Sequence, residues 1–225
     1  MNTDEFRKAG LSEHAAVSSD LKRVDPVSAL AASFRRHDRV LEEARIESGR
    51  VLACKEGCSY CCHFKVDVRA DEALIIAEFV RTRLDATTRA QVIEAAERNA
   101  GFIRSLSPKQ HLTTNIKCCF LVDGRCSIYS VRPYACRNFH ATDVAGCIRL
   151  FEEPENLDVP DSYVPEIHAR GAGHREGRQA AVMDAGLDVR AYDLTTAFLE
   201  ALSAASAVKR LRQGKRALIQ AIVID

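Results

Sequence analysis

Apolar residues recur at helical spacing in five separate stretches of the chain, and this pattern predicts a mainly α-helical fold. Pro26 is suited to open the first helix and Gly49 to end it. Asp71 suits the first turn of the second helix, Asp85 can cap the third, and Pro108 follows the end of the third. The last two helices are expected near the C-terminus. The five apolar stripes are Val27, Leu30, Ala31, Phe34, Leu41 and Ala44; Ala73, Ile76, Ala77, Val80 and Leu84; Ile93, Ala96, Ala100 and Ile103; Leu194, Ala197, Phe198, Ala201, Leu202 and Ala205; and Leu211, Leu218, Ala221 and Ile222.

One hairpin is predicted within this helical pattern. The pair Asp123-Gly124, which is preferred in tight turns, stands between residues 118–122 and 125–129. Residues 63–68 alternate in polarity and can form a short strand or an extended segment. Pro133 can begin a short helix that contains Cys136. The expected fold class is therefore mainly α, a helical domain with a small β-hairpin.

Two segments carry no apolar period. Residues 1–25 are polar and are expected to be a flexible N-terminal arm, and residues 152–190 are acidic and rich in glycine and are expected to be a loop region. Residues 26–151, which contain all the cysteines, are expected to form one domain with flanking helices. Residues 191–225 are expected to supply C-terminal helices that pack on the same domain.

Composition narrows the function and the compartment. The chain has 225 residues and a net charge of +1, so charge alone indicates neither a nucleic acid nor a membrane partner. Tryptophan is absent and aromatic residues make up 6%, which argues against recognition of bases by stacking. No apolar run approaches the roughly 20 residues that cross a bilayer, and the N-terminus has no apolar core, so a cytoplasmic location is expected.

Four cysteines lie within nine residues, and we call Cys54, Cys58, Cys61 and Cys62 the cysteine knot. In a reducing compartment such clustering indicates metal or redox chemistry rather than disulfides, because thiolates bind zinc and iron–sulfur clusters. Gly57 lets the backbone turn tightly before the second cysteine. Neighbouring Cys61 and Cys62 can both bind metal only if the chain bends between them or if they serve two ions.

A second set of cysteines lies far along the chain: Cys118, Cys119, Cys126, Cys136 and Cys147. If both sets bind, the intervening helices must fold back, and the metal would staple the domain. In a regular hairpin Cys119 and Cys126 share a face while Cys118 points away, and a one-residue change in the loop reverses this. For Cys119 and Cys147, ordinary packing explains the residue as well as ligation does.

Two motifs together resemble a known family. The pattern C-x3-C-x2-C-C of the knot is followed by Cys118-Cys119-Phe120-Leu121, by Cys126-Ser127-Ile128-Tyr129, by Arg132-Pro133 and by Cys136-Arg137. Over roughly residues 50–150 the chain is similar to the YkgJ-type CxxxCxxCC cysteine-cluster family, described as a zinc- or iron-chelating domain. Related clusters occur in flagellin lysine N-methylases, where an iron–sulfur cluster is implied.

The resemblance implies a ligand set. The family has proline where this chain has Cys119, so Cys118 is the matching ligand and Cys119 is kept as the alternative. Cys147 matches a cysteine of one subgroup. Catalytic residues are not indicated, and the neighbouring His63 and His140 are expected to have roles other than ligation. The implied ligands are Cys54, Cys58, Cys61, Cys62, Cys118, Cys126, Cys136 and Cys147.

Three functional hypotheses follow from these residues. The first is a metal-chelating protein that holds an iron–sulfur cluster for a redox or accessory enzymatic role, with an unidentified protein or redox partner. The second is a structural or interaction module stapled by Zn²⁺, since eight cysteines can close two tetrahedral sites. The third, by family analogy, is a protein-modifying enzyme related to flagellin lysine N-methylases.

Overall fold

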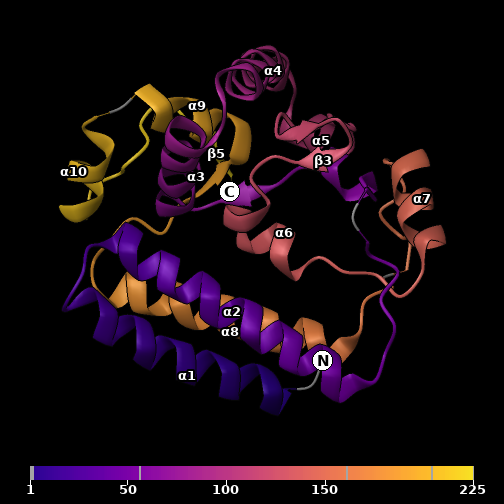
Figure 1. Cartoon of the computed structure of the whole chain (residues 1–225), viewed down its shortest axis with the longest axis horizontal. Coiled ribbons are helices and arrows are strands. Elements are labelled where there is room, and N and C mark those ends of the chain that lie inside the picture. Colours follow the sequence, from indigo (N-terminus) through magenta and orange to yellow (C-terminus); the bar gives the residue numbers. More distant parts are fainter. Residues whose placement is uncertain (1–2, 56, 161, 204, 225) are drawn as a thin grey trace.

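Three long helices lie side by side along one edge of the molecule (Figure 1). In the computed structural model, which describes residues 3–55, 57–160, 162–203 and 205–224, helix α8 packs against both of the other two. The three helices are α1 (Thr3–Leu21), α2 (Pro26–Ser48) and α8 (Pro165–Asp184).

A second group of helices surrounds the main apolar core, and α9 packs against both α3 and α4 in this group. The core contains Val68, Phe120, Tyr192 and Phe198. A small antiparallel sheet in the order β1-β4-β5 borders it. The elements are α3 (Ala70–Arg83), α4 (Ala86–Ser105), α9 (Leu194–Ser203), α10 (Ala207–Arg212), β1 (Asp67–Val68), β4 (Ala191–Asp193) and β5 (Val223–Ile224).

Short elements connect the two groups, and α6 contacts α2, α8 and β1. In Figure 1, α6 lies between the long helices and the second group, and α7 lies at the side of the molecule. None of the helices in the described ranges is both long and apolar enough to span a membrane. The short elements are η1 (Tyr60–His63), α5 (Pro108–Leu112), β2 (Leu121–Val122), β3 (Arg125–Cys126), η2 (Tyr129–Val131), α6 (Tyr134–Asn138) and α7 (Val144–Glu152).

The predicted helix ends and the hairpin are confirmed. The Asp25 carboxylate caps α2, the Asp85 carboxylate caps α4, and Gly49 ends α2 with φ of 61°. The two strands of the hairpin pair in the register Leu121↔Cys126, closed by Asp123 and Gly124, both with positive φ. A mainly helical fold with one small hairpin follows directly from the apolar stripes and these local signals.

The structure differs from the prediction at residues 1–25 and 152–190, where a flexible arm and a loop region are expected. Residues 3–21 and 165–184 are α-helices in the described chain. Their contact surface is built from small residues, because Gly10 of α1 packs directly on Gly173 and Gly177 of α8. Because these two helices have no regular apolar stripe, hydrophobic periodicity in the sequence does not predict them.

A buried polar network also joins these three helices. The Glu13 carboxylate accepts hydrogen bonds from Arg36 at 2.7 and 2.8 Å and lies 3.0 Å from His174 Nε2. Burial opposes ionisation of Glu13, but the bonds from His174 and Arg36 outweigh it and lower its pKa to about 2. Charged pairing therefore adds to two small apolar clusters, one between α1 and α8 and one between α2 and α8.

The last predicted helix, patterned by Leu211, Leu218, Ala221 and Ile222, is also different. Helix α10 ends at Arg212, and Gly214 follows with φ of 67°. The Glu200 carboxylate then accepts the backbone N–H groups of residues 219–221 at 2.7–2.8 Å, which holds this segment outside a helix. The Glu200 side chain of α9 thus determines the backbone conformation of a segment whose sequence has helical periodicity.

The close contact between α1 and α8 generates a test. Gly177→Ala should lower the free energy of unfolding by about 1–3 kcal/mol, because a Cβ there overlaps the Gly10 backbone and must push the helices apart. Gly101→Ala on α4 is the matched control, since its Cβ meets nothing within 4 Å, and it should stabilise by about 0.5–1 kcal/mol. Urea unfolding of both variants measures the difference. Equal effects in the two variants would contradict the packing.

Candidate metal centre

The cysteine knot is a series of tight turns. Gly57 has φ of 87°, Cys58 N donates to Lys55 O at 3.1 Å, and Cys62 N donates to Ser59 O at 3.0 Å within the η1 turn. The thiols of Cys61 and Cys62 share a hydrogen bond, which raises the pKa of Cys61 and lowers that of Cys62 to about 7. The chain therefore bends between these two neighbours, so that both thiols point the same way.

Backbone hydrogen bonds bring the second set of cysteines to the knot. Cys118 N donates to Cys62 O at 2.8 Å, and Ile116 N donates to His63 O at 2.9 Å. Ala53 N, just before the knot, donates to Ala141 O at 2.8 Å. Residues 53–63 are thus fixed against residues 116–141, and the helices between them fold back as the separation of the two cysteine sets requires.

Cys118 and Cys119 are neighbours whose thiols share a hydrogen bond. This bond lowers the pKa of Cys118, while burial and the same bond raise the pKa of Cys119. They begin a turn in which Leu121 N donates to Cys118 O at 3.0 Å, so the alternation of an extended strand does not apply to them. Cys119 is 3% exposed and packs in the main core, whereas Cys118 lies within electrostatic range of Cys62 and Cys126. Cys118 thus interacts with Cys62, Cys126 and Cys136, and the choice of Cys118 over Cys119 as the ligand stays a prediction.

Four thiols from four separate segments form one group, which we call the inner group: Cys62, Cys118, Cys126 and Cys136. Burial raises the pKa of Cys126 to about 11, and the nearby Cys118 and Cys62 add to the effect. Burial likewise raises the pKa of Cys136 well above its usual value, with further increases from Cys118 and Cys126. The four thiols are close enough that a negative charge on one disfavours a charge on another.

Three more cysteines, Cys54, Cys58 and Cys147, form a second group, the outer group. Burial raises the pKa of Cys147, and the charges of Cys54 and Cys58 raise it further. Cys147 lies on α7, a helix that packs against η1 and is capped by the Asp143 carboxylate, which accepts from Gly146 N at 2.8 Å. Cys61 interacts with both Cys54 and Cys136, so it stands between the two groups.

The donor chemistry fits zinc or an iron–sulfur cluster, but the thiols do not surround a common point. Among the described residues, no group of three or more His, Cys, Asp or Glu side chains has the geometry of a formed metal site. All nine cysteines are free thiols, and sets of four thiolates suit either metal. Binding an ion would therefore require the thiols of each group to turn toward a shared centre.

Two histidines beside the cysteines make structural contacts. His140 accepts from Val164 N at 3.0 Å through Nε2, while its Nδ1 lies 3.0 Å from Asn138 O. His63 Nδ1 lies 3.1 Å from Ser59 O, and its ring packs on Phe151. Both ring nitrogens of His140 are thus engaged by the backbone.

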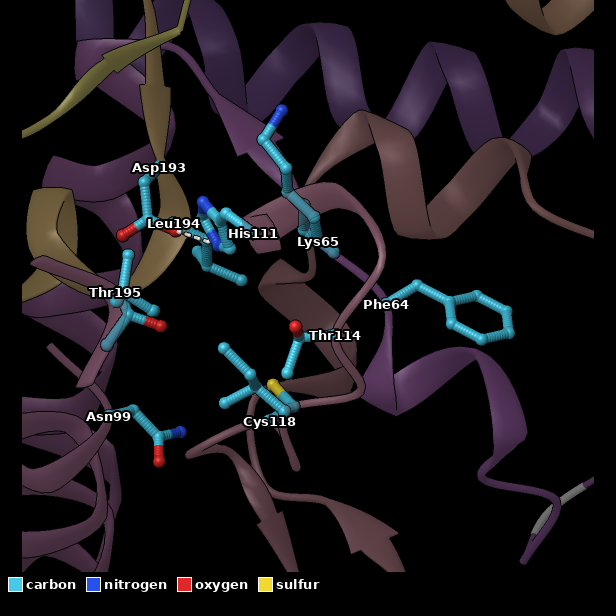
Figure 2. Close-up of a pocket in the computed structure, with 12 residues that line it drawn as sticks. Phe64, Lys65, Asn99, His111, Thr114, Cys118, Asp193, Leu194 and Thr195 are labelled. Carbon is cyan, nitrogen blue, oxygen red and sulfur yellow. Dashed lines mark ion pairs between the residues drawn. The ribbon is translucent and has the colours of Figure 1, made fainter. Parts of the chain in front are cut away.

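A small hollow opens beside Cys118 (Figure 2). Its volume of about 30 Å³ holds one or two water molecules. His111 Nε2 lies 3.6 Å from Asp193 Oδ2 at its wall, and burial lowers the pKa of His111 although the Asp193 charge acts in the opposite direction. The hollow is too small for an organic substrate.

Glu72 is a site residue that the sequence analysis did not identify as one. It is 3% exposed, and its carboxylate accepts from Arg69 N at 2.7 Å and from Tyr134 N at 2.9 Å. The second bond fixes the start of α6, the helix that carries Cys136. Burial raises the pKa of Glu72, and its charge contributes to the raised pKa of Cys136. The bond from Arg69 N is a local capping-box contact, since Arg69 is the N-cap of α3 and Glu72 is its third helical residue. The bond from Tyr134 N comes from a distant segment, so the local sequence does not reveal it.

Arg137 is the second such residue, and it orients the loop before α6. Its guanidinium donates to the Asp38 carboxylate at 2.6 and 2.7 Å and to the carbonyl oxygens of Arg132 and Ser130 at 2.7 and 2.6 Å. It also lies 4.2 Å above the Phe34 ring. This contact network joins the segment between Cys126 and Cys136 to α2.

Taken together, the fold and the thiol groups define a helical cysteine-cluster domain. The family model CxxCxxCC, with the description "Putative zinc- or iron-chelating domain", matches residues 53–162. Residues 53–162 thus match the model of the cysteine-cluster family that the motifs indicate, and the description supports chelation of zinc or iron. The matched residues include all nine cysteines. No curated protein and no solved structure matches the chain.

The position of Glu72 generates a second test. Glu72→Ala should destabilise the protein by about 1–3 kcal/mol for each backbone N–H left without an acceptor. Glu72→Gln keeps one acceptor oxygen and should lose less. Glu94→Ala is the control, because this exposed residue pairs only with Arg98 on the same helix and should change stability by less than about 0.5 kcal/mol. Chemical unfolding compares the three variants, and a Glu72→Ala protein as stable as the control would refute the role.

Proposed function

We propose that the inner group, Cys62, Cys118, Cys126 and Cys136, holds an iron–sulfur cluster, and that the protein serves a redox or accessory enzymatic role. The observation that supports this proposal is the proximity of four thiols that come from η1, the turn at 118–121, β3 and α6. Four thiolates are the usual ligands of such clusters. When bound, the cluster would supply one-electron transfer.

The electrostatics of the inner group support a cationic occupant. Burial and mutual proximity raise the pKa values of Cys126 and Cys136, so these thiols resist ionisation when no cation is present. Metal binding replaces the protons and stabilises the thiolates, and part of its binding energy then stabilises the fold. Free thiols also require reducing conditions, which is why we place the protein in the cytoplasm.

The outer group carries the alternative function. With Cys61, the residues Cys54, Cys58 and Cys147 make a second set of four, and two sets of four thiolates suit two tetrahedral Zn²⁺ sites. In that case both ions would staple the knot to α6 and α7, and the protein would be a structural or interaction module. All eight cysteines are ligands under this alternative.

Metal content and the visible spectrum distinguish the two functions. Protein purified without oxygen should be brown, with iron and acid-labile sulfide in comparable amounts. A colourless protein with stoichiometric zinc would overturn the cluster and support the zinc module. A protein that takes up neither metal after reconstitution would overturn both.

Cysteine variants test which thiols bind. Cys62→Ser and Cys136→Ser should lose metal and stability together, because metal binding supplies folding energy. Cys119→Pro is the matched control. It changes the neighbour of Cys118 but keeps a residue compatible with the second position of a turn, and it should retain metal. Loss of metal in Cys119→Pro with retention in Cys118→Ser would show that Cys119 is the ligand instead.

A further inference from the structure

A polar cavity of about 250 Å³ lies beside α6, and its lining comes from β1, the start of α3, α6 and α8. Its charged residues are four cations, Lys65, Arg69, Arg175 and Arg178, and two acids, Asp67 and Glu72. The volume corresponds to that of about eight water molecules in the liquid. The space is therefore sufficient for a small organic anion.

Both acids of the cavity lining already have partners within the protein. Asp67 pairs with Lys65 at 3.0 Å, and Glu72 accepts the two backbone bonds described above. Arg69 donates to two neutral oxygens, Val189 O at 2.9 Å and Gln179 Oε1 at 2.7 Å. The lining carries four cations and two acids, and Arg175 also pairs with Glu176, which lies outside the lining, at 3.0 Å. The lining itself therefore has an excess of positive charge.

The arginines of α8 present this charge. Arg175 and Arg178 are three positions apart and lie on the same side of the helix. The Arg178 side chain is 3% exposed and pairs with the buried Asp71 carboxylate, which lies outside the lining. Burial and the charge of Arg69 lower the pKa of Arg178 to about 9, and burial and the charge of Arg175 lower the pKa of Arg69. These cations are close enough to repel one another, and an anion between them would remove that repulsion.

We propose that this cavity binds a small molecule through a carboxylate or phosphate group held by Arg69, Arg175 and Arg178. Guanidinium groups present paired donors that match both oxyanions. The N-terminus of α3, which begins at Ala70 beside Arg69, adds the positive end of its helix dipole.

The cavity adjoins the cysteine cluster. Tyr134 and Ala135 line it, and Cys136 is the next residue of the same helix. Glu72 belongs to the lining and also affects the pKa of Cys136. A ligand in the cavity would therefore lie beside the helix that carries Cys136. Binding of the anion itself does not depend on the proposed metal.

Calorimetric titration at constant ionic strength tests the proposal with three probes: inorganic phosphate, glycerol phosphate and succinate. Saturable binding of phosphate alone would identify a free-ion site, whereas tighter binding of one organic probe would identify the class of ligand. Arg175→Glu should weaken binding about tenfold or more, because a charged hydrogen bond is replaced by repulsion. Arg175→Lys should recover part of the affinity. Arg98→Glu, an exposed change on α4 outside the lining, should leave it unchanged.

Two variants distinguish a failure of the anion proposal from a failure of the metal proposal. Arg175→Glu should keep the metal content of the original protein, and Cys62→Ser should keep anion binding if it remains folded by circular dichroism. No saturable binding of any probe would overturn the proposal, as would equal affinities in Arg175→Glu and Arg98→Glu. Arg69→Gln provides an independent second variant, and it should also weaken binding.

Discussion

The pairing of residues 116–118 with residues 62–63 is the constraint on which the cysteine cluster depends. Buried thiols that repel one another when ionised cannot draw the chain together by themselves, so the backbone bonds Cys118 N to Cys62 O and Ile116 N to His63 O have to hold the two halves. Helices α3 and α4 make the return possible, because they pack with α9 in the main core, which also contains Cys119. The scaffold therefore brings the thiols close before any ion binds, and the ion has only to complete the convergence.

Glu72 extends this constraint to the other side of α6. A carboxylate buried this deeply is costly unless its oxygens are bonded, and the two oxygens of Glu72 take the backbone N–H groups of Arg69 and Tyr134. One side chain thus fixes the start of α3, the start of α6 and the wall of the cationic cavity. Because Glu72 also influences Cys136, the charge of an anion in the cavity and the charge state of the inner group act on the same short helix.

The part of the fold that could be predicted is the part whose packing is apolar. The stripes of residues 26–48, 70–83 and 86–105 predict α2, α3 and α4, and the Asp123-Gly124 pair predicts the hairpin. Helices α1 and α8 escape prediction, because glycine contacts and the Glu13 network take the place of a regular apolar stripe. For residues 219–221 the pattern is helical, but the Glu200 carboxylate of another helix captures their N–H groups, an interaction that local sequence does not reveal.

The same distinction applies to the site. Cysteine spacing predicts a ligand set, but it does not reveal the division of the thiols into inner and outer groups. The place of Cys118 beside Cys62 depends on the 118–121 turn and on the backbone bond from Cys118 N to Cys62 O. The sequence does not predict the cationic cavity for the same reason that it does not predict α8: the buried face of this helix mixes glycine, His174 and Arg178 with its apolar residues. Natural sequences depart from local consistency mainly where function requires it. Helix α8 contributes His174 to the Glu13 network and Arg178 to the cavity. A helix that the apolar pattern does not predict thus connects the long helices to the cavity beside the cysteines.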